Sequence, residues 1–363
     1  MRFDVLVLGC GPAGAAVAMV LANGGAKVLV LERATASKWK PGEILDGSVI
    51  WPLREMHAHH AIKALGQLRS AGTMSIWGGV EASEIEGISS AVGGNLLVDR
   101  DAFEQGLRED VQNVVAAYVP YDAKIGITRV RQGFGVRWLG SKQQALCSIV
   151  VEATGRAAGA LGQGHRLALD ELVGLLAYVE APREHHDTRL YIESSKDGWW
   201  YSVLLPNGKL VIAFMTDAKV ARGGEGRRRS LFEAALSATT LTRSRIPIAL
   251  EGISLRSAPA NTSRRTALCG NNWLAVGDAA SAYDPLAGQG VPGALARGAA
   301  AGRLILAEGS FMKAMNLYAD AERSCFADYL QVRRIIYSRE TRWKNYQFWQ
   351  ARREAISVAS CQT

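Results

Sequence analysis

The most constraining feature of this 363-residue sequence is the stretch 4–33. Residues 5–8 form a charge-free apolar run, which is typical of a strand buried in a parallel sheet. Three glycines follow at G-x-G-x-x-G spacing, and then small and apolar helix formers occupy residues 13–21. A second apolar run, residues 27–31, ends at Glu32. This order of strand, glycine turn, helix and strand within about 30 residues predicts one dinucleotide-binding βαβ unit.

The glycine turn has the chemistry that a bound pyrophosphate requires. Gly9 turns the chain out of the strand, Gly11 leaves the backbone open to phosphate, and Gly14 lets the helix lie close to the sheet. The helix N-terminus then directs free N–H groups and a positive dipole at the phosphates. Glu32 ends the second strand, where a carboxylate accepts hydrogen bonds from a ribose diol and repels a 2′-phosphate. The predicted cofactor-binding residues of this unit are Gly9, Gly11, Pro12, Ala13, Gly14, Glu32 and Arg33.

The chain contains a second set of glycines at the same spacing, Gly288, Gly290 and Gly293. Because the chain has 38 glycines, such spacing alone is weak evidence; the flanking strands, helix and Glu32 favour the first set as the dinucleotide site over a merely structural turn. No strand directly precedes the second set, so it is not another nucleotide fingerprint. With Pro292 in the first turn of an Ala-rich helix, it predicts a glycine-lined helix N-terminus against a flat or anionic ligand.

Composition places the chain among globular proteins, because 48% of its residues are hydrophobic and 21% are charged. No apolar run approaches the roughly 20 residues of a membrane span. The first strand follows Met1-Arg2-Phe3 directly, without the apolar segment of a signal peptide. We therefore expect a cytoplasmic protein without a membrane span.

Charge and metal-binding residue types give no second function. The five cysteines are scattered, without a C-x-x-C pair, and His57 and His60 have no carboxylate cluster beside them, so we expect neither disulfides nor a metal site. The net charge of +8 comes from scattered arginines, a run at residues 227–229 and an Arg-rich C-terminal segment. We find no nucleic-acid motif; an anionic cofactor and an acidic protein partner explain this charge equally well.

The rest of the chain alternates between helical and extended patterns. We expect helices at residues 49–67, from a cap at Asp99 or Asp101 to residue 111, and at 230–239, 291–307 and 311–353. Asn207-Gly208 between apolar runs predicts a hairpin in a mainly antiparallel layer. The expected strands are 73–79, 87–98, 114–120, 123–131, 135–139, 145–151, 173–179, 188–193, 199–205, 211–215 and 272–276, with an extended segment at 246–256.

Three motifs together resemble the FAD-dependent aromatic hydroxylases and halogenases over nearly the whole chain. They are the N-terminal glycine turn, the Glu-Ala-Thr-Gly-Arg turn at 152–156 and the late pair Gly277-Asp278. The resemblance implies an α/β fold: a Rossmann-type FAD-binding domain of the p-hydroxybenzoate hydroxylase kind, an interleaved antiparallel β substrate domain and C-terminal helices. The implied FAD-binding domain is 1–70, 96–165 and 255–310, the substrate domain 71–95 and 166–254, and the helical segment 311–363.

The same resemblance assigns roles around the flavin. Arg100 corresponds to a flavin-side arginine, and Asp278 is implied to contact the ribityl chain. The other implied flavin-site residues are Gly277, Gly288, Gln289, Gly290 and Val291, the last four lining the ring at the helix N-terminus. Because the chain has no second nucleotide fold, the reductant is either transiently bound NAD(P)H or a separate flavin reductase.

A narrower resemblance concerns the substrate. Pro-Gly-Glu at 41–43, Gly-Trp-Trp-Tyr at 198–201 and Asp-Pro-Leu-Ala-Gly-Gln-Gly at 284–290 are similar to flavoproteins that mature oxidases carrying cysteine tryptophylquinone. Phe-Met-Thr-Asp at 214–217 and the Arg-Trp…Phe-Trp-Gln-Ala-Arg-Arg segment at 342–353 belong to the same likeness. It implies monooxygenation of a tryptophan side chain in a precursor oxidase or dehydrogenase, which is then the protein partner.

Catalysis of this kind is mostly positioning and exclusion of water. Glu43 and Asp284 are the candidate catalytic carboxylates, and the alternative for each is a loop or cap role. The candidate substrate-lining residues are Trp77, Trp199, Tyr201 and Met215, with core packing as the alternative. Because residues alternate faces along a strand, Trp199 and Tyr201 share one face and Trp200 takes the other.

Three other functions were compared with this hypothesis. Halogenation is disfavoured because residues 64–123 contain no lysine and Trp199-Trp200-Tyr201-Ser202 departs from the halogenase Trp-x-Trp-x-Ile-Pro motif. Hydroxylation of a small free phenol or indole, and a flavin-binding chaperone without turnover, stay open as alternatives. The sequence does not specify the oligomeric state.

Overall fold

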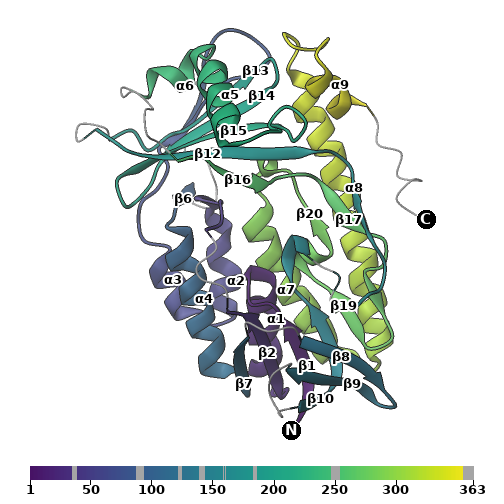
Figure 1. Ribbon diagram of the computed structural model, residues 1–363. Helices are drawn as coiled ribbons and strands as arrows, with labels where there is room; N and C mark the ends of the chain where they lie inside the picture. Colours follow the sequence, from purple (N-terminus) through teal and green to yellow (C-terminus); the bar gives the residue numbers. More distant parts are fainter. Residues whose placement is uncertain are drawn as a thin grey trace.

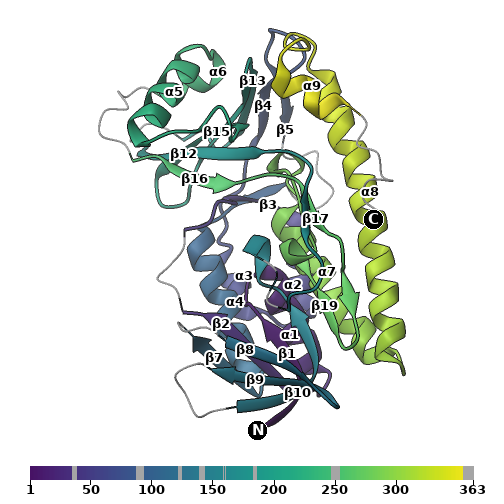
Figure 2. The same ribbon diagram turned by 45° about the vertical axis from the view of Figure 1, so that its right-hand side comes forward.

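The computed structural model contains two β-sheets at opposite ends of an elongated body, and the long helix α8 (Phe311–Arg339) runs beside both (Figures 1 and 2). The structure describes residues 1–34, 39–86, 94–121, 125–138, 144–157, 159, 161–182, 186–246 and 254–354. This arrangement confirms the expected α/β class with a parallel sheet, an antiparallel sheet and C-terminal helices.

The first sheet is built around β1 (Arg2–Leu8), which pairs in parallel with β2 (Val28–Arg33) on one side and β10 (Gln144–Glu152) on the other. Its order is β18 (Cys269–Gly270), β19 (Trp273–Ala275), β10, β1, β2 and β7 (Ala117–Tyr121). A hairpin of β8 (Ile125–Val130) and β9 (Gly133–Trp138) joins β10 in antiparallel fashion. Residues 5–8 of β1 and 28–31 of β2 are buried, which explains the continuous apolar runs there.

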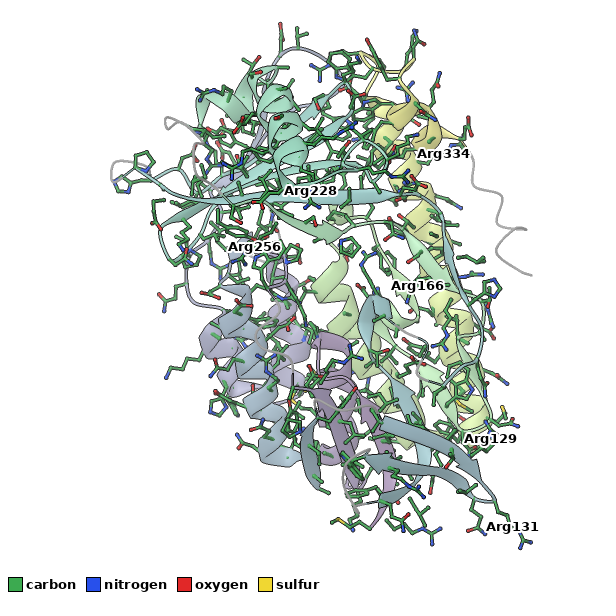
Figure 3. All side chains as sticks on the ribbon, viewed as in Figure 1. Arg129, Arg131, Arg166, Arg228, Arg256 and Arg334 are labelled. Carbon is green, nitrogen blue, oxygen red and sulfur yellow. The ribbon has the colours of Figure 1, made fainter. Side chains whose placement is uncertain are left out.

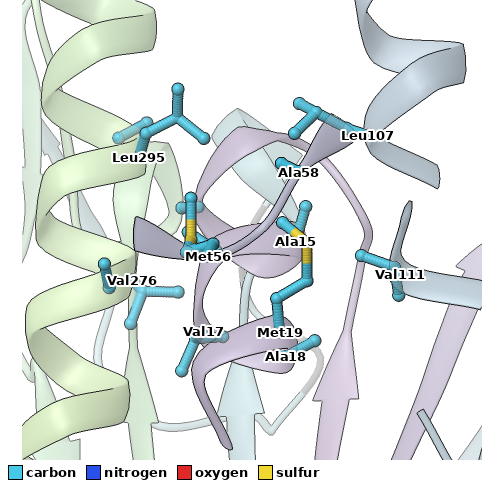
Figure 4. Packing of buried hydrophobic residues seen from close by; sticks show 14 of the residues in the cluster. Ala15, Val17, Ala18, Met19, Met56, Ala58, Leu107, Val111, Val276 and Leu295 are labelled. Carbon is cyan, nitrogen blue, oxygen red and sulfur yellow. The ribbon is translucent and has the colours of Figure 1, made fainter. Parts of the chain in front are cut away.

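The helices α1 (Pro12–Asn23), α4 (Arg100–Val114) and α7 (Gly290–Ala307) pack into one core with this sheet. Figure 4 shows part of it, with Met19 of α1 on the side of Val111 of α4 and Val17 on the side of Val276. Small residues allow α1 and α7 to touch: a Cβ on Gly298 would overlap the Ala13 carbonyl, and one on Gly302 would overlap Val20. These glycines let α7 lie along α1, with Gly298 against Ala13 at the start of α1 and Gly302 against Val20 nearer its end.

The second sheet is antiparallel except for one parallel pair, β13 (Leu190–Ser195) with β4 (Gly72–Ile76). Its order is β16 (Arg256–Pro259), β12 (Leu172–Glu180), β15 (Lys209–Asp217), β14 (Gly198–Leu204), β13, β4 and β5 (Ser83–Glu86). Gly208 has φ +78°, and the hairpin predicted at Asn207-Gly208 is confirmed between β14 and β15. One face is covered by α5 (Glu225–Ser237) and α6 (Leu241–Ser244) (Figure 1).

Short elements complete the described structure. Two small sheets pair β3 (Ile44–Asp46) with β6 (Asn95–Leu97), and β17 (Ser263–Arg265) with β11 (Arg166–Ala168) and β20 (Ser281–Ala282). The 3-10 turns are η1 (Gly47–Val49), η3 (Gly155–Ala157), η4 (Gly277–Ala279) and η5 (Pro285–Ala287). The remaining helices are α2 (Ile50–Glu55), α3 (His59–Ala64) and α9 (Gln347–Arg353).

Two predicted helices were wrong in continuity. The expected helix 49–67 is divided into η1, α2 and α3 because His57 adopts a left-handed conformation with φ +58°. The expected helix 311–353 stops after Arg339 and resumes as α9. At the break, the Glu340 carboxylate accepts hydrogen bonds from the Gly78 amide and the Ser194 hydroxyl, so tertiary contacts replace helical ones.

Several expected segments differ at their ends. The helix expected at 230–239 begins earlier, as α5 at Glu225. Of the strand expected at 87–98, residues 87–93 lie outside the described residues, and the remainder forms only β6. Residues 122–124, 139–143, 247–253 and 355–363, including Cys361, also lie outside the described residues. We propose the three-part domain division, with β16 assigned to the substrate domain because it pairs with β12.

Two features of the described residues bear on membrane association and on metal binding. No helix among the described residues is long and apolar enough to cross a membrane. Within the same residues, no group of three or more His, Cys, Asp or Glu side chains is arranged to hold a metal ion. Nδ1 of His60 lies 2.7 Å from a carboxylate oxygen of Asp110, a residue of α4.

Candidate functional site

The three glycines of the N-terminal turn have different surroundings. Gly9 has φ +96°, and a Cβ there would lie 2.5 Å from the Ala153 carbonyl oxygen. A Cβ on Gly14 would overlap the Gly9 carbonyl oxygen. Gly11 differs, because apart from its own chain neighbours and helix backbone no atom of the described residues lies within 4 Å of its Cβ position. Gly9 and Gly14 are therefore required by the fold, whereas Gly11 leaves open space at the N-terminus of α1.

Glu32 lies beside this turn. Its carboxylate accepts a hydrogen bond from the Cys10 backbone N–H at 2.5 Å, across the ends of β1 and β2. The Cys10 side chain is buried, and burial together with the nearby Glu32 charge raises the pKa of its thiol. Cys10 is therefore a protonated, space-filling residue, and Glu32 is the polar group at the edge of the turn.

The Gly277-Asp278 pair lies against the same turn. Gly277 has φ +58°, and its Cβ position is 2.6 Å from the Ala13 side chain. The Asp278 carboxylate is 35% exposed and lies 3.4 Å from Nε of Arg156. Arg156 also donates to the Asn261 and Tyr283 carbonyls, so it is rigidly held. Sequence analysis missed Arg156 as a site residue, although the Glu-Ala-Thr-Gly-Arg turn contains it.

The N-terminus of α7 is open. Gly288 has φ +63°, and nothing lies within 4 Å of the Cβ positions of Gly288 and Gly290. Gln289 is the N-cap residue, and its side chain makes no capping hydrogen bond. These three residues are exposed, and in the first turn Gly290 and Val291 have N–H groups without an intrahelical acceptor, since Pro292 has no N–H and Gly293 donates to the Gln289 carbonyl. This geometry suits an acceptor atom or a negative charge.

Arg100 is directed at the same region from the start of α4. Its Nε and Nη2 donate to the Glu104 carboxylate at 3.2 and 2.6 Å. Its Nη1 is buried without a hydrogen-bond partner among the described residues, and it lies 3.1 Å from the Cβ position of Gly42. Val291 lies 3.9 Å from that position. A buried N–H of a guanidinium requires an acceptor, so this atom is a candidate contact for a bound ligand.

The predicted substrate residues Trp77, Trp199, Tyr201 and Met215 lie in one cluster. We call it the aromatic cluster; its other members include Trp39, Tyr178, Leu286, Tyr337, Phe348 and Trp349. Trp200 lies on the opposite face of the sheet, stacked on Phe214 with ring centroids 4.5 Å apart. The predicted alternation of faces along this strand is therefore confirmed.

The loop at Glu43 joins the aromatic cluster to Arg100. The Glu43 carboxylate is 4% exposed and accepts hydrogen bonds from the hydroxyls of Tyr178 and, at 3.3 Å, Tyr201. Trp39 donates its Nε1–H to the Tyr178 hydroxyl at 2.8 Å. Burial raises the pKa of Tyr178 and Tyr201, and the Glu43 charge raises it further, so both tyrosines are donors. Gly42, the preceding residue, is the one beside Arg100 Nη1.

Asp284 joins the aromatic cluster to the start of α7. It is 1% exposed; one carboxylate oxygen caps η5 at the Leu286 N–H, and the other accepts the Tyr337 hydroxyl at 2.7 Å. Burial raises the pKa of Asp284 against the opposing charge of Arg333, whose Nε lies 3.5 Å away. The two candidate carboxylates thus occupy different positions, each bonded to tyrosine hydroxyls of one cluster.

Sequence reasoning missed Tyr178 and Tyr337. Tyr178 had a weak signal, because it shares the face of Leu172 and Leu176 on β12. No pattern in the sequence pointed to Tyr337, because only the path of α8 brings it to Asp284. Charge is not concentrated at the site: Figure 3 labels arginines near both ends of the molecule, among them Arg129 and Arg334.

The chain has the fold of the FAD-dependent oxidoreductase superfamily, whose members include hydroxylases and halogenases. A curated relative, the putative FAD-dependent oxidoreductase LodB of Marinomonas mediterranea, is 27% identical over 370 residues, covering 98% of each chain. The solved structure of QhpG, a peptidyl tryptophan dihydroxylase essential for tryptophylquinone cofactor biogenesis, superposes with a TM-score of 0.81 at 24% identity, covering 97% of this chain and 79% of QhpG.

A halogenase shares the fold as well. The myxobacterial chondrochloren halogenase CndH gives a TM-score of 0.83 at 19% identity, over 99% of this chain and 87% of that one. No protein-family model matches the sequence. At these identities the structural matches establish the fold, and the reaction has to be argued from the site.

Proposed function

We propose that this FAD-dependent oxidoreductase is a monooxygenase that hydroxylates a tryptophan side chain of a precursor oxidase or dehydrogenase during cysteine tryptophylquinone biogenesis. The motifs at 41–43, 198–201 and 284–290 support the proposal, as does the similarity to LodB and QhpG. The observation that carries it is the aromatic cluster, which reaches both the Glu43 loop beside Arg100 and the η5 loop before α7.

The residues of the site fit an FAD. In this proposal Gly11, Glu32 and Asp278 hold the dinucleotide, and Arg100 Nη1 and the start of α7 face the flavin. When bound and reduced, by NAD(P)H or by a separate flavin reductase, FAD supplies the activation of O2. The full set of proposed FAD-binding residues is Gly9, Gly11, Pro12, Ala13, Gly14, Glu32, Arg33, Arg100, Gly277, Asp278, Gly288, Gln289, Gly290 and Val291.

The chain's own residues position the substrate and exclude water. In this proposal the rings of the aromatic cluster, among them Trp199 at 2% exposed, pack beside the incoming indole and shield it from water. Glu43 and Asp284 are the candidate acid–base residues, each within a hydrogen bond of a tyrosine that lines the cluster. Catalysis then depends chiefly on holding the indole in one orientation.

Co-expression with the precursor protein tests the proposal. We expect mass spectrometry to find one or two added oxygen atoms on a single tryptophan of the precursor, and the quinone to form only when this chain is present. Gly11→Leu should abolish the modification, because its side chain would occupy the open space that begins at the Cβ position of Gly11, at the α1 N-terminus. Gly226→Leu is the matched control, since Gly226 on α5 is equally open and far from the site.

Other results would contradict the assignment. Quinone formation without this chain excludes a role in maturation. NADH oxidation that is stimulated by indole or phenol, with stoichiometric product and an unmodified precursor, favours the free aromatic. Precursor maturation that survives Gly11→Leu favours a chaperone without turnover.

A further inference from the structure

Tyr337 occupies a position that the proposed function does not explain. It lies on α8, is fully buried, and makes two side-chain hydrogen bonds in opposite directions. Its hydroxyl accepts the Nε1–H of Trp199 at 3.0 Å and donates to the Asp284 carboxylate at 2.7 Å. One hydroxyl group therefore connects a ring on the predicted substrate side with a carboxylate beside the predicted flavin side.

Asp284 fixes the loop that leads into α7. Its other oxygen accepts the Leu286 N–H at 2.9 Å, and its own N–H donates to the Tyr329 hydroxyl at 2.8 Å. The following residues form η5, then Gly288 in a left-handed conformation, then the open helix start at Gly290. A change at the Asp284 carboxylate therefore changes the loop that orients the first-turn N–H groups of α7.

Trp199 lies at the other end of the connection. It belongs to β14, and its neighbours in the aromatic cluster include Tyr201, whose ring centroid is 6.3 Å away. Leu286 of η5 packs in the same cluster, so the loop and the cluster touch directly as well as through Tyr337. Arg333 anchors this part of α8 by donating to Asp170 at 2.8 Å.

We propose that Tyr337 is a positioning residue that couples the aromatic cluster to the loop 284–290. A ring that enters the cluster and displaces the Trp199 indole removes a donor from the Tyr337 hydroxyl. The hydroxyl is then free to rotate and its bond to Asp284 changes, so the start of α7 responds to occupation of the cluster. The inference rests on the proposed function for the identity of the two ligands, but not for the connection itself.

A double-mutant cycle tests the connection without any ligand. Tyr337→Phe keeps the ring and removes both hydrogen bonds, and Trp199→Phe removes the N–H donor together with part of the buried indole ring. We expect hydrogen–deuterium exchange at amides 286–290 to rise about tenfold in Tyr337→Phe, as expected for loss of a hydrogen bond to a carboxylate. Trp199→Phe should raise it less, and should have no further effect in the Tyr337→Phe background.

Tyr318→Phe is the matched control. Tyr318 is also buried on α8, but its hydroxyl has no hydrogen-bond partner among the described residues, so its loss should leave exchange at 286–290 unchanged. Equal exchange in Tyr337→Phe and Tyr318→Phe, or additive effects of Trp199→Phe and Tyr337→Phe, would overturn the proposal. If Tyr337→Phe does not fold, the cycle is run with Asp284→Asn, which removes the acceptor and retains a capping oxygen.

A spectroscopic readout separates this inference from the proposed function. With FAD added, Tyr337→Phe should change the visible absorbance and the midpoint potential of the bound flavin, and Tyr318→Phe should change neither. Failure of the wild-type chain to bind FAD would end the proposed function while the exchange result still decides the coupling. An unchanged flavin spectrum and potential in Tyr337→Phe, beside a faster-exchanging loop, would restrict Tyr337 to a structural role.

Discussion

Nη1 of Arg100 lies 3.1 Å from the position that a Cβ would occupy on Gly42. The two residues come from different elements, the first turn of α4 and the loop before β3, and they meet at the edge of the aromatic cluster. Because Nη1 is buried without a partner among the described residues, Arg100 has a charged N–H available for a ligand. The first prediction follows from this atom.

Arg100→Met should weaken FAD binding by at least tenfold, because a charge-assisted hydrogen bond to the cofactor is lost. Quenching of FAD fluorescence on titration measures the dissociation constant. Arg108→Met is the control: Arg108 lies 3.7 Å from the same Glu104 carboxylate but is more exposed. Equal affinities for the two variants would show that Arg100 does not contact the cofactor.

Substitutions at the glycines of the two helix starts should differ in their effect on stability. Gly14→Ala should lower the free energy of unfolding by about 2 kcal/mol or more, because the new methyl group overlaps the Gly9 carbonyl. Gly290→Ala should leave stability unchanged or slightly raised, since its Cβ position is open and alanine favours helix. Urea unfolding measures both; a stable Gly14→Ala variant would contradict the close contact of α1 with its own glycine turn.

Glu104 should make stability depend on pH. Burial raises its pKa, but the charges of Arg100 and Lys40 outweigh burial, so the folded pKa lies below the ordinary value. A depressed carboxyl pKa stabilises the folded state above the unfolded pKa, about 4.3, and this contribution is lost as pH falls through the folded pKa. Glu104→Gln should therefore be less stable than wild type at pH 7, and the difference should shrink below about pH 4.

Urea unfolding at the two pH values checks this prediction. Glu109→Gln on the same helix is the control, because the hydrogen bond that the Glu109 carboxylate accepts comes from the uncharged side chain of Gln105. A stability difference for Glu104→Gln that is the same at both pH values would show that the ion pairs do not set the pKa.

The two faces of β14 should respond differently to substitution. Trp200→Ala should cost about 3–5 kcal/mol of stability, because the fully buried ring packs on Phe214 and Phe232. Tyr201→Phe should leave the fold intact, since it removes only the hydroxyl that donates to Glu43 at 3.3 Å. We expect that variant to bind FAD normally and to form less hydroxylated precursor per reductant consumed.

Measuring the hydroxylated precursor and the consumed reductant in the same assay tests the prediction for Tyr201→Phe. An unchanged ratio in Tyr201→Phe would place the substrate away from this face. Tyr121→Phe is a suitable control, because Tyr121 lies on β7 at the other sheet.

Local chemistry made the first βαβ unit predictable. Gly9 and Gly14 stand where backbone conformation and close packing exclude a side chain, and the apolar runs of β1 and β2 follow from burial on both faces of a parallel sheet. The hairpin at Asn207-Gly208 and the opposite faces of Trp199 and Trp200 were predictable for the same reason, because turn preference and strand alternation act between near neighbours in sequence.

Most elements of this protein, the glycine-lined helix starts and the set of aromatic residues can be predicted from local sequence patterns. Packing in three dimensions is needed to see that Tyr178 and Tyr201 share the Glu43 carboxylate and that Tyr337 lies between Trp199 and Asp284. It is also needed to see that the helices expected at 49–67 and 311–353 are interrupted. These features depend on contacts between residues up to 262 positions apart in the sequence. Such contacts depend on how the two sheets and α8 pack, and no periodicity in a local stretch encodes that packing.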